Sequence, residues 1–316
     1  MTVNDIRFLE TDNKAQCYQR YHELKCMTVS SEKENIVYNR YLKKSQNKEL
    51  ARERLPVILE CKDGEMPEYD LASHILHSSP REVYIGRFIE TRKTLDRSFH
   101  GCYTEARQLV QDSILENIVK DRKNESRPVI IFTSGTMGAG KTTTVNSFQV
   151  SGILGESFVT IDQDHLRSQL PEWENYLKRQ GERAGALLQR ESGYLAEIAL
   201  KETLACSQNI IFDSSLRDTS WWESRFKHIR QTYPQYRIVI LNIRTNLETA
   251  ISRAQLRATG RICPEEIVRD SYFQYLHAFE CLRNLADFTA VVDNSELPVF
   301  VDESASSLEH FIYYDT

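Results

Sequence analysis

The sequence lacks any apolar run close to the roughly 18 to 20 residues that a helix needs to cross a bilayer. Its first residues, MTVNDIRFLETDNKAQ, also lack the positive charge followed by an apolar stretch that marks a secretory signal peptide. We therefore expect no membrane-spanning helix and no standard secretion, and a cytoplasmic location fits this pattern. Export by a specialised machinery that reads other signals stays open.

Cysteine pairs and an excess of positive charge are absent as well. The seven cysteines include no C-x-x-C pair and their number is odd, so neither a zinc site nor a disulfide framework is indicated, and a reduced compartment fits. The formal net charge of −5 disfavours nucleic acid as a partner, and a local basic groove is the alternative that net charge leaves open. With 316 residues, 41% of them apolar, the chain is long enough for one large domain or two modest ones.

The polar, charge-dense segment KDRKNESRP, residues 120–128, is the best candidate for a domain boundary. It predicts an N-terminal region, residues 1–125, whose role the sequence does not reveal. A second domain is then expected over residues 126–316.

The N-terminal region reads as mostly helical. Residues 106–119, ARQLVQDSILENIV, carry apolar side chains at helical spacing, and a further helix is expected within residues 3–24. The stretch VYIGRFI, residues 83–89, fits either a strand or a buried helical turn.

The second domain alternates strand-like and helix-like segments. Five short runs, most of them rich in β-branched and aromatic residues, are expected to be strands covered on both faces. These runs are residues 129–134, 157–162, 209–213, 236–243 and 288–293. The alternation predicts an α/β fold, a parallel five-stranded sheet between helices, with a mostly helical N-terminal extension.

A glycine-rich turn, GTMGAGKTT, follows the first of these runs and satisfies the pattern G-x-x-x-x-G-K-[ST]. In such a turn, backbone N–H groups point inward around phosphate oxygens, and the following helix directs its positive end to the same anion. Lys141 supplies a charge for the β- and γ-phosphates, and Thr142 offers a hydroxyl to Mg²⁺. The expected nucleotide-binding residues are Gly135, Thr136, Met137, Gly138, Ala139, Gly140, Lys141, Thr142 and Thr143.

Two aspartates, Asp162 and Asp164, end the next predicted strand, on the edge of the sheet where the glycine-rich turn also lies. Asp164 is a candidate to accept a hydrogen bond from an acceptor hydroxyl in phosphoryl transfer. Arg167, one turn later, is a candidate to bind a second anion. The alternative is that Asp164 only caps the helix that follows.

Asp213 ends the third strand, in IIFDSSLRD, and is a candidate for the water shell of Mg²⁺. The alternative is again a helix cap. Ser214 and Ser215 follow it and could hydrogen-bond to a substrate.

Residues 253–266, RAQLRATGRICPEE, carry three arginines that could converge on a phosphoryl group as it gains charge in the transition state. Arg253 and Arg257 share a helix face, and Arg261 falls on a loop before Pro264. A solvated charged face is the alternative for each of them.

Taken in order, GTMGAGKTTT, IDQDHLRSQLPEW, IIFDSSLRD and RAQLRATGRICPEE resemble the zeta-toxin-type P-loop kinases, over about residues 128–295. The resemblance implies a kinase-like α/β fold and transfer of phosphate from ATP or GTP, with Mg²⁺, to the 3′-hydroxyl of the sugar in UDP-N-acetylglucosamine. It also implies that Asp164 is the catalytic aspartate, that Glu197 contacts the sugar nucleotide, and that Ser215 matches a substrate-binding hydroxyl residue. Arg261 and either Arg253 or Arg257 then match the phosphate-clamping arginines.

The sequence thus predicts a phosphotransferase whose acceptor is a small molecule with a hydroxyl group, a nucleotide sugar being the first choice. One alternative is a kinase for another acceptor, such as a polynucleotide 5′-hydroxyl or an antibiotic. A second alternative is a nucleotide-dependent switch whose N-terminal region binds a protein partner or an inhibitor. Nucleotide turnover that rises when a small acceptor is added would separate the enzyme from the switch.

Overall fold

The computed structural model describes residues 71–119, 124–155, 157–256, 264–301 and 304–314. The helix expected within residues 3–24 lies outside these ranges. Contacts between Cα atoms divide the chain into two compact units. Among the described residues, one unit combines 71–114 with 167–198, and the other combines 115–166 with 199–314. The division at residues 125 and 126 that the sequence suggests stays a prediction.

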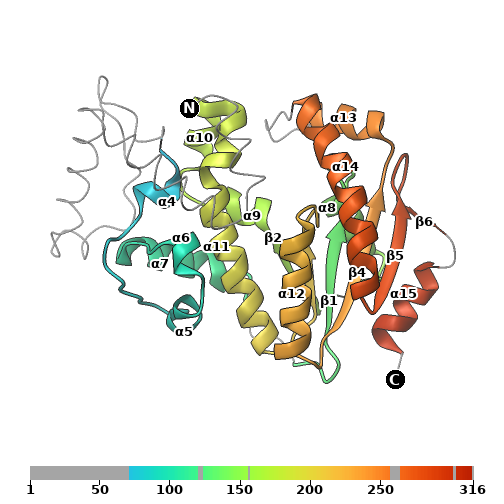
Figure 1. The fold of residues 1–316 in the computed structure, drawn as a ribbon, viewed down its shortest axis with the longest axis horizontal. Helices are drawn as coiled ribbons and strands as arrows, with labels where there is room; N and C mark the ends of the chain where they lie inside the picture. The colour runs from blue at the N-terminus through green and yellow to red at the C-terminus, as the bar shows by residue number, and fades with distance from the viewer. Residues whose placement is uncertain (1–70, 120–123, 156, 257–263, 302–303, 315–316) are drawn as a thin grey trace. The chain divides into compact units, whose positions relative to one another are not determined.

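The second unit is built on a six-stranded sheet in the order β2-β3-β1-β4-β5-β6 (Figure 1). All five predicted strands are present and parallel, which confirms the α/β fold. Their bounds are β1 Val129–Ser134, β2 Val159–Asp162, β3 Ile210–Asp213, β4 Arg237–Arg244 and β5 Phe288–Asp293. The sixth strand, β6 (Val299–Phe300), pairs antiparallel with β5 and was not predicted, because two residues are too few to show a strand period.

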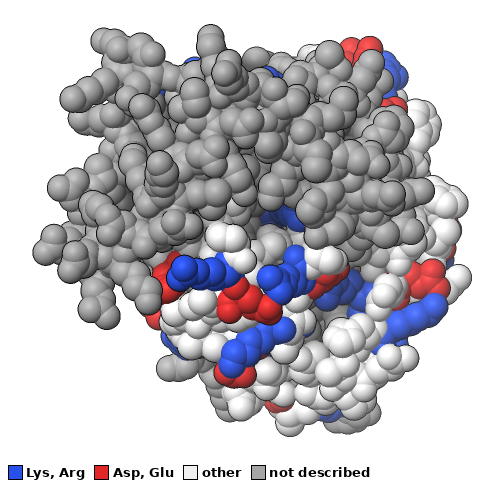
Figure 2. All heavy atoms as spheres, turned by 60° about the vertical axis from the view of Figure 1, so that its left-hand side comes forward, with Lys and Arg blue, Asp and Glu red and all other residues white. Residues whose placement is uncertain are grey.

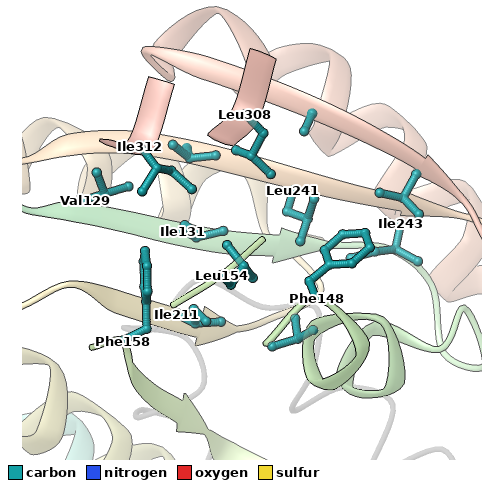
Figure 3. Packing of buried hydrophobic residues seen from close by; sticks show 14 of the residues in the cluster. Val129, Ile131, Phe148, Leu154, Phe158, Ile211, Leu241, Ile243, Leu308 and Ile312 are labelled. Carbon is teal, nitrogen blue, oxygen red and sulfur yellow. The ribbon is translucent and has the colours of Figure 1, made fainter. Parts of the chain in front are cut away.

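Helices α8 (Lys141–Val150) and α15 (Ser304–Tyr313) cover one face of this sheet. Figure 3 shows Phe148 of α8 and Leu308 and Ile312 of α15 packed against side chains of the strands, among them Ile131 and Leu241. These side chains are almost fully buried. The apolar runs of the strands therefore form the core that holds the start of α8, and with it the glycine-rich turn, at the end of β1.

The opposite face is covered through aromatic rings of α12 (Thr219–Thr232). Phe132 of β1 lies with its ring centroid 5.2 Å from that of Trp222 and 4.9 Å from that of Phe226. Helix α14 (Glu265–Leu282) packs beside α12, and α13 (Leu247–Gln255) packs on α14. Helices on both faces explain why the central strands are apolar along their whole length.

The other unit is mostly helical. Its helices are α4 Ser73–Leu76, α5 Ile89–Lys93, α6 Arg97–His100, α7 Glu105–Glu116, α10 Trp173–Gln180, a 3₁₀ turn over Gly181–Arg183, and the first part of α11 Ala184–Ala205. The prediction of a helix within residues 106–119 is confirmed by α7. The unit boundary falls within α7, within α11 and within the short helix α9 (Gln163–Ser168).

The stretch 83–89 is a loop up to Phe88, and only its last residue, Ile89, belongs to α5, so neither a strand nor a helical turn describes the stretch as a whole. A side chain of α7 holds this loop. Gln108 accepts a hydrogen bond from the Ile85 N–H at 2.9 Å and donates one to the Val83 carbonyl at 2.7 Å. Apolar composition suggested regular structure here, but the backbone is satisfied by a side chain instead of by a strand or helix.

A cluster of buried charges joins α7, α10 and α11 within this unit. The guanidinium of Arg107 donates to Glu191 at 2.6 Å and, with two further bonds of 2.9 Å, to Glu172. His77 Nε2 lies 2.8 Å from Oε1 of Glu172, the oxygen that also accepts from Arg107 Nη1. Burial tends to raise the pKa of Glu172, but the hydrogen bond from His77 and the charge of Arg107 outweigh it and lower that pKa to about 2.

Charged side chains are mixed on the part of the surface that Figure 2 shows. Lys and Arg lie beside Asp and Glu there, and neither sign forms a continuous field over the described atoms of that face. Among the residues that the structure describes, no helix is both long and apolar enough to cross a membrane.

Candidate active site

The glycine-rich turn lies between the end of β1 and the first turn of α8. Gly138 and Gly140 have φ angles of +80° and +81°, which side chains of L-residues rarely adopt. Space is lacking as well. A Cβ at Gly138 would overlap the carbonyl oxygen of Ala250, and a Cβ at Gly140 would overlap the side-chain amide of Asn294. Glycine is therefore required at both positions by conformation and by packing.

The other side chains of the turn point into the protein and leave its backbone to face a ligand. Thr136 is fully buried against α14, with its hydroxyl 3.4 Å from the Val268 carbonyl and from the Ser271 hydroxyl. Met137 packs on an apolar cluster of α13 and α14 that includes Ala250. This arrangement suits an anion site made of peptide N–H groups.

Lys141 opens α8 and lies over the turn. Its Nζ donates to the carbonyls of Gly135 and Thr136, at 3.1 and 3.2 Å. The ammonium group is thus placed beside the N-terminus of a helix, where positive charge and the helix dipole act together on an anion. Thr142 and Thr143 follow and are exposed.

Asp213 is held between two threonines. One carboxylate oxygen accepts a hydrogen bond from Thr142 Oγ1 at 2.7 Å, and the other accepts one from Thr133 Oγ1, also at 2.7 Å. Thr133 is itself tied to Ser214 by hydrogen bonds through its hydroxyl and its carbonyl. The hydroxyl and the carboxylate predicted to serve Mg²⁺ therefore lie in direct contact.

Asp162 caps α9, which corrects one alternative considered from the sequence. Its Oδ1 accepts hydrogen bonds from the N–H groups of Asp164 and His165, at 2.8 and 3.3 Å. The alternative in which Asp164 is the cap is wrong, because Asp164 lies inside the first turn of the helix and is exposed. The cap at the N-terminus of α9 is therefore made by Asp162 and not by the carboxylate of Asp164.

The carboxylates gather at the same edge of the sheet. The register of β2 and β3 places Asp162 directly beside Asp213. Burial, together with the charges of Asp213 and Asp164, raises the pKa of Asp162 above its ordinary value. Negative charge is concentrated here, next to the end of the glycine-rich turn.

These groups fit Mg²⁺, which prefers oxygen ligands and keeps several waters. Among the described residues, no three His, Cys, Asp or Glu side chains are grouped to hold a metal by themselves. A magnesium ion at Thr142 and Asp213 would therefore take its other ligands from water and from a bound phosphate, as this ion usually does.

Arg253 contacts the backbone that follows β5. Its Nη1 donates to the Asn294 carbonyl at 2.6 Å, and its Nη2 donates to the Ser295 carbonyl at 3.2 Å. Its role as a phosphate clamp stays a prediction. Arg257 and Arg261 lie outside the described residues.

The remaining predicted substrate residues fall in two places. Ser215 is half-buried in the segment between β3 and α12. Arg167 and Glu197 belong to the mostly helical unit. There the buried Arg167 donates to Gln189, and Glu197 pairs with the buried His100 at 3.4 Å. Their contact with a substrate stays a prediction.

Two side chains of this site were missed from the sequence, Thr133 and Asn294. Thr133 lies on β1 and orients Asp213, whereas Asn294 follows β5 and donates to the carbonyl of Ala139 at 2.8 Å. Both occupy the carboxyl edge of the sheet, where ligands of open parallel sheets bind. That position was the one available signal, and it does not distinguish them from other polar residues at strand ends.

Comparison with known proteins places the chain in a family. A search among curated proteins finds no match. A solved structure from the PezAT chromosomal toxin–antitoxin system of Streptococcus pneumoniae is similar at 18% identity and a TM-score of 0.53, over 68% of this chain and 90% of that one. The native AvrRxo1-ORF1:-ORF2 complex is similar at 13% identity and a TM-score of 0.50, over 77% and 82%.

At these identities the similarity to solved structures shows the fold alone. The match to a family is more direct. Residues 90–305 match the zeta toxin family, and the match begins well ahead of the residue near 128 where the resemblance was expected to start. It covers more than half of the sequence and includes the glycine-rich turn, the carboxylates of β2 and β3, and Arg253. The chain belongs to the zeta toxin family.

Proposed function

We propose that this protein transfers the γ-phosphate of ATP or GTP to a hydroxyl group of a small molecule, with a nucleotide sugar such as UDP-N-acetylglucosamine as the first choice of acceptor. Membership of the zeta toxin family and the glycine-rich turn support a nucleotide-dependent kinase. The nucleotide sugar is the finer part of the proposal, and it rests on the resemblance of residues such as Glu197 and Ser215.

The observation that carries the proposal is the contact between Thr142 and Asp213, 2.7 Å apart, beside the phosphate-binding turn. It brings a hydroxyl and a carboxylate together at the point where a nucleotide's terminal phosphates would end. Thr142 and Asp213 would hold magnesium there, and the ion would supply positive charge against the negative charge that develops during phosphate transfer.

Each step of the proposed transfer has its own residues. The backbone of the turn and Lys141 hold the phosphates, and Asp213 with Thr142 hold the metal. Asp164 is exposed next to this edge, and Asp162 is the residue that accepts from the first N–H groups of α9. Asp164 would orient the acceptor hydroxyl toward the γ-phosphate and accept its proton late in the transfer.

The test is a screen of nucleotide sugars with Mg²⁺ and ATP labelled in the γ-phosphate, in which transfer is read as a gain of mass on the sugar nucleotide. We expect a phosphorylated product with wild-type protein, and a rate of product formation lower by roughly a hundredfold or more with Asp164→Asn. Release of the label only as inorganic phosphate would contradict the kinase and favour a switch that hydrolyses nucleotide. Transfer to another hydroxyl compound alone would keep the kinase and reject the nucleotide sugar.

A protein partner or inhibitor that acts through the N-terminal region is part of the same proposal. One of the solved structures to which this chain is similar comes from a toxin–antitoxin system, which supports the idea by analogy. We expect such a partner to lower the rate of nucleotide turnover by the full-length protein. A partner that binds without changing the turnover of nucleotide would contradict an inhibitory role.

A further inference from the structure

Asn294 joins three separate segments at the phosphate-binding turn. Its backbone N–H donates to the Arg244 carbonyl at the end of β4, at 2.8 Å. Its own carbonyl accepts from Arg253 of α13 at 2.6 Å, and its side-chain amide donates to the carbonyl of Ala139 at 2.8 Å. Asn294 is only 6% exposed, so its side chain is held in this position by the surrounding protein.

The carbonyl of Ala139 needs such a donor. When the N–H groups of a turn point inward to an anion, the carbonyls of the same peptides point outward into the protein. A buried carbonyl there must find a hydrogen bond, and Ala139 is fully buried. Lys141 donates hydrogen bonds to the carbonyls of Gly135 and Thr136, and the side-chain amide of Asn294 donates one to the carbonyl of Ala139.

The hydrogen bond to Ala139 also fixes the next N–H group. The peptide between Ala139 and Gly140 is planar, and its C=O and N–H point in opposite directions. An amide that holds the carbonyl on one side therefore directs the Gly140 N–H to the other side. The side chain of Asn294 is so close to Gly140 that a Cβ there would overlap its amide nitrogen, so the peptide has little room to rotate.

We propose that Asn294 is a positioning residue of the phosphate-binding turn, which aims the Gly140 N–H at the nucleotide phosphates by holding the carbonyl of Ala139. The proposal rests on the proposed function only in taking a nucleotide as the ligand. Asn294 acts through the backbone of the turn and does not itself contact the phosphates.

The test uses the full-length protein and a matched pair of variants, Asn294→Ala and Asn209→Ala. Asn209 is 7% exposed and accepts a hydrogen bond of 2.8 Å from the Val129 N–H, at the opposite end of β1 from the turn. Each variant removes one buried hydrogen bond between an asparagine side chain and the backbone. A purely structural role predicts the same behaviour for both.

We expect Asn294→Ala to weaken the binding of Mg²⁺–ATP by about tenfold, the effect of one misdirected hydrogen bond, in titration calorimetry. Both variants should lower the melting temperature of the protein by similar amounts, because each loses one buried hydrogen bond. Asn209→Ala should leave the dissociation constant of Mg²⁺–ATP within about twofold of the wild-type value. Equal dissociation constants for the two folded variants would overturn the proposal.

Hydrogen exchange without nucleotide tests the same idea independently of the proposed function. Peptides that cover residues 135–142 should exchange faster in Asn294→Ala than in wild type or Asn209→Ala, and equal exchange would overturn the proposal. Where Asn294→Ala does not fold, the isosteric Asn294→Asp lacks the donor and should show the same faster exchange. Failure of the wild-type protein to bind Mg²⁺–ATP would reject the proposed function, while the exchange result would still decide the role of Asn294.

Discussion

The Thr142 hydroxyl donates a hydrogen bond of 2.7 Å to the carboxylate of Asp213, although 71 residues separate the two in the sequence. The contact arises because β1 and β3 are neighbouring parallel strands that end at the same edge of the sheet. Thr133 holds the other carboxylate oxygen, so the orientation of Asp213 is set by the protein itself. A carboxylate fixed in this way is prepared to help hold a metal with little rearrangement.

Asp213→Asn should remove most of the effect of Mg²⁺ on nucleotide binding. The substitution keeps the size of the side chain but removes the charge that attracts the ion. We expect the tightening of ATP binding by Mg²⁺ to fall by about tenfold or more, or about 1.4 kcal/mol. Binding without Mg²⁺ should stay equal or improve, because one negative charge near the phosphates is lost. Calorimetric titrations with and without Mg²⁺ measure both quantities.

Asp218→Asn is the control for that experiment. Asp218 lies five residues later, caps α12 by accepting from the Trp221 N–H, and loses the same charge on substitution. Asparagine caps about as well as aspartate, so stability should be kept. An Asp213→Asn variant that responds to Mg²⁺ as Asp218→Asn does would contradict the metal site.

Lys141→Ala should nearly abolish the stabilisation of the protein by nucleotide. The ammonium group makes charge-assisted hydrogen bonds to phosphates, and losing them should weaken ATP binding by roughly 10- to 100-fold. Stability without nucleotide should change by less than about 1 kcal/mol. The rise in melting temperature on adding Mg²⁺–ATP is the measurement. Lys227→Ala, at an exposed lysine paired with Glu223, should leave that rise unchanged.

Gly140→Ala should destabilise the protein more than Gly152→Ala. Both glycines have a φ of +81°, so both substitutions carry the same conformational penalty of about 1–2 kcal/mol. A Cβ at Gly152 meets no atom within 4 Å, whereas one at Gly140 overlaps the amide of Asn294. The difference between the two free energies of unfolding, from urea titrations, therefore isolates the crowding. Equal losses would show that the turn can move away from Asn294 at no cost.

Acid should weaken the mostly helical unit through Glu172. Its pKa is lowered to about 2, against about 4.3 in an unfolded chain. A lowered folded-state pKa contributes stability that is present above the unfolded value and is lost as the pH falls toward the folded value. Of about 3 kcal/mol in total, roughly 2 kcal/mol should therefore disappear between pH 4.5 and 2, and the rest at lower pH. The groups that face Glu172 are Arg107 and His77.

The free energy of unfolding of Glu172→Gln, measured by circular dichroism across this pH range, tests whether the pKa of Glu172 is lowered in the folded protein. The variant should be less stable than wild type at pH 7, and the difference should shrink as the pH falls below 4.5. Glu174→Gln, at an exposed position of α10, the helix that follows Glu172, should follow the wild-type profile. A constant difference between Glu172→Gln and wild type would contradict the lowered pKa.

The sequence predicted the parts of the site that depend on local pattern. The strands are short apolar runs separated by helical patterns, and the glycine-rich turn combines conformation and chemistry within a few residues. Contacts between distant residues leave no such pattern. Asn294 meets Ala139 across 155 positions, and Glu191 meets Arg107 across 84. An asparagine after a strand and a glutamate on a helix have many possible partners, and only the packing of the elements selects one.

The assignment of the cap shows a second limit. Asp162 and Asp164 both precede a helical pattern, and either could accept from N–H groups two or three residues later. The choice depends on whether the helix begins at Gln163 or two residues further on, which propensity does not resolve. In the structure, the pairing of β2 with β3 ends at Asp162, so the helix begins at Gln163 and Asp162 is the residue that caps it.

Asp164→Asn should reduce phosphate transfer by roughly a hundredfold or more, the usual effect of losing a positioned acid–base group. An ordinary aspartate is a weak base at neutral pH, so its main contribution is the orientation of the acceptor hydroxyl, which a neutral amide supports poorly. Nucleotide affinity should change little, because Lys141 and the turn are intact. Transfer rate with a saturating acceptor and the dissociation constant of ATP are measured on the same preparation.

Paired alanine variants separate this catalytic role from a structural one. Asp164→Ala should leave stability within about 1 kcal/mol of wild type, because the exposed Asp164 does not cap α9. Asp162→Ala removes the acceptor for the N–H groups of Asp164 and His165 and should cost about 1 kcal/mol. Loss of transfer in Asp164→Ala with stability and ATP binding intact is the expected result. Near wild-type transfer by folded Asp164→Ala would mean that another group orients the acceptor.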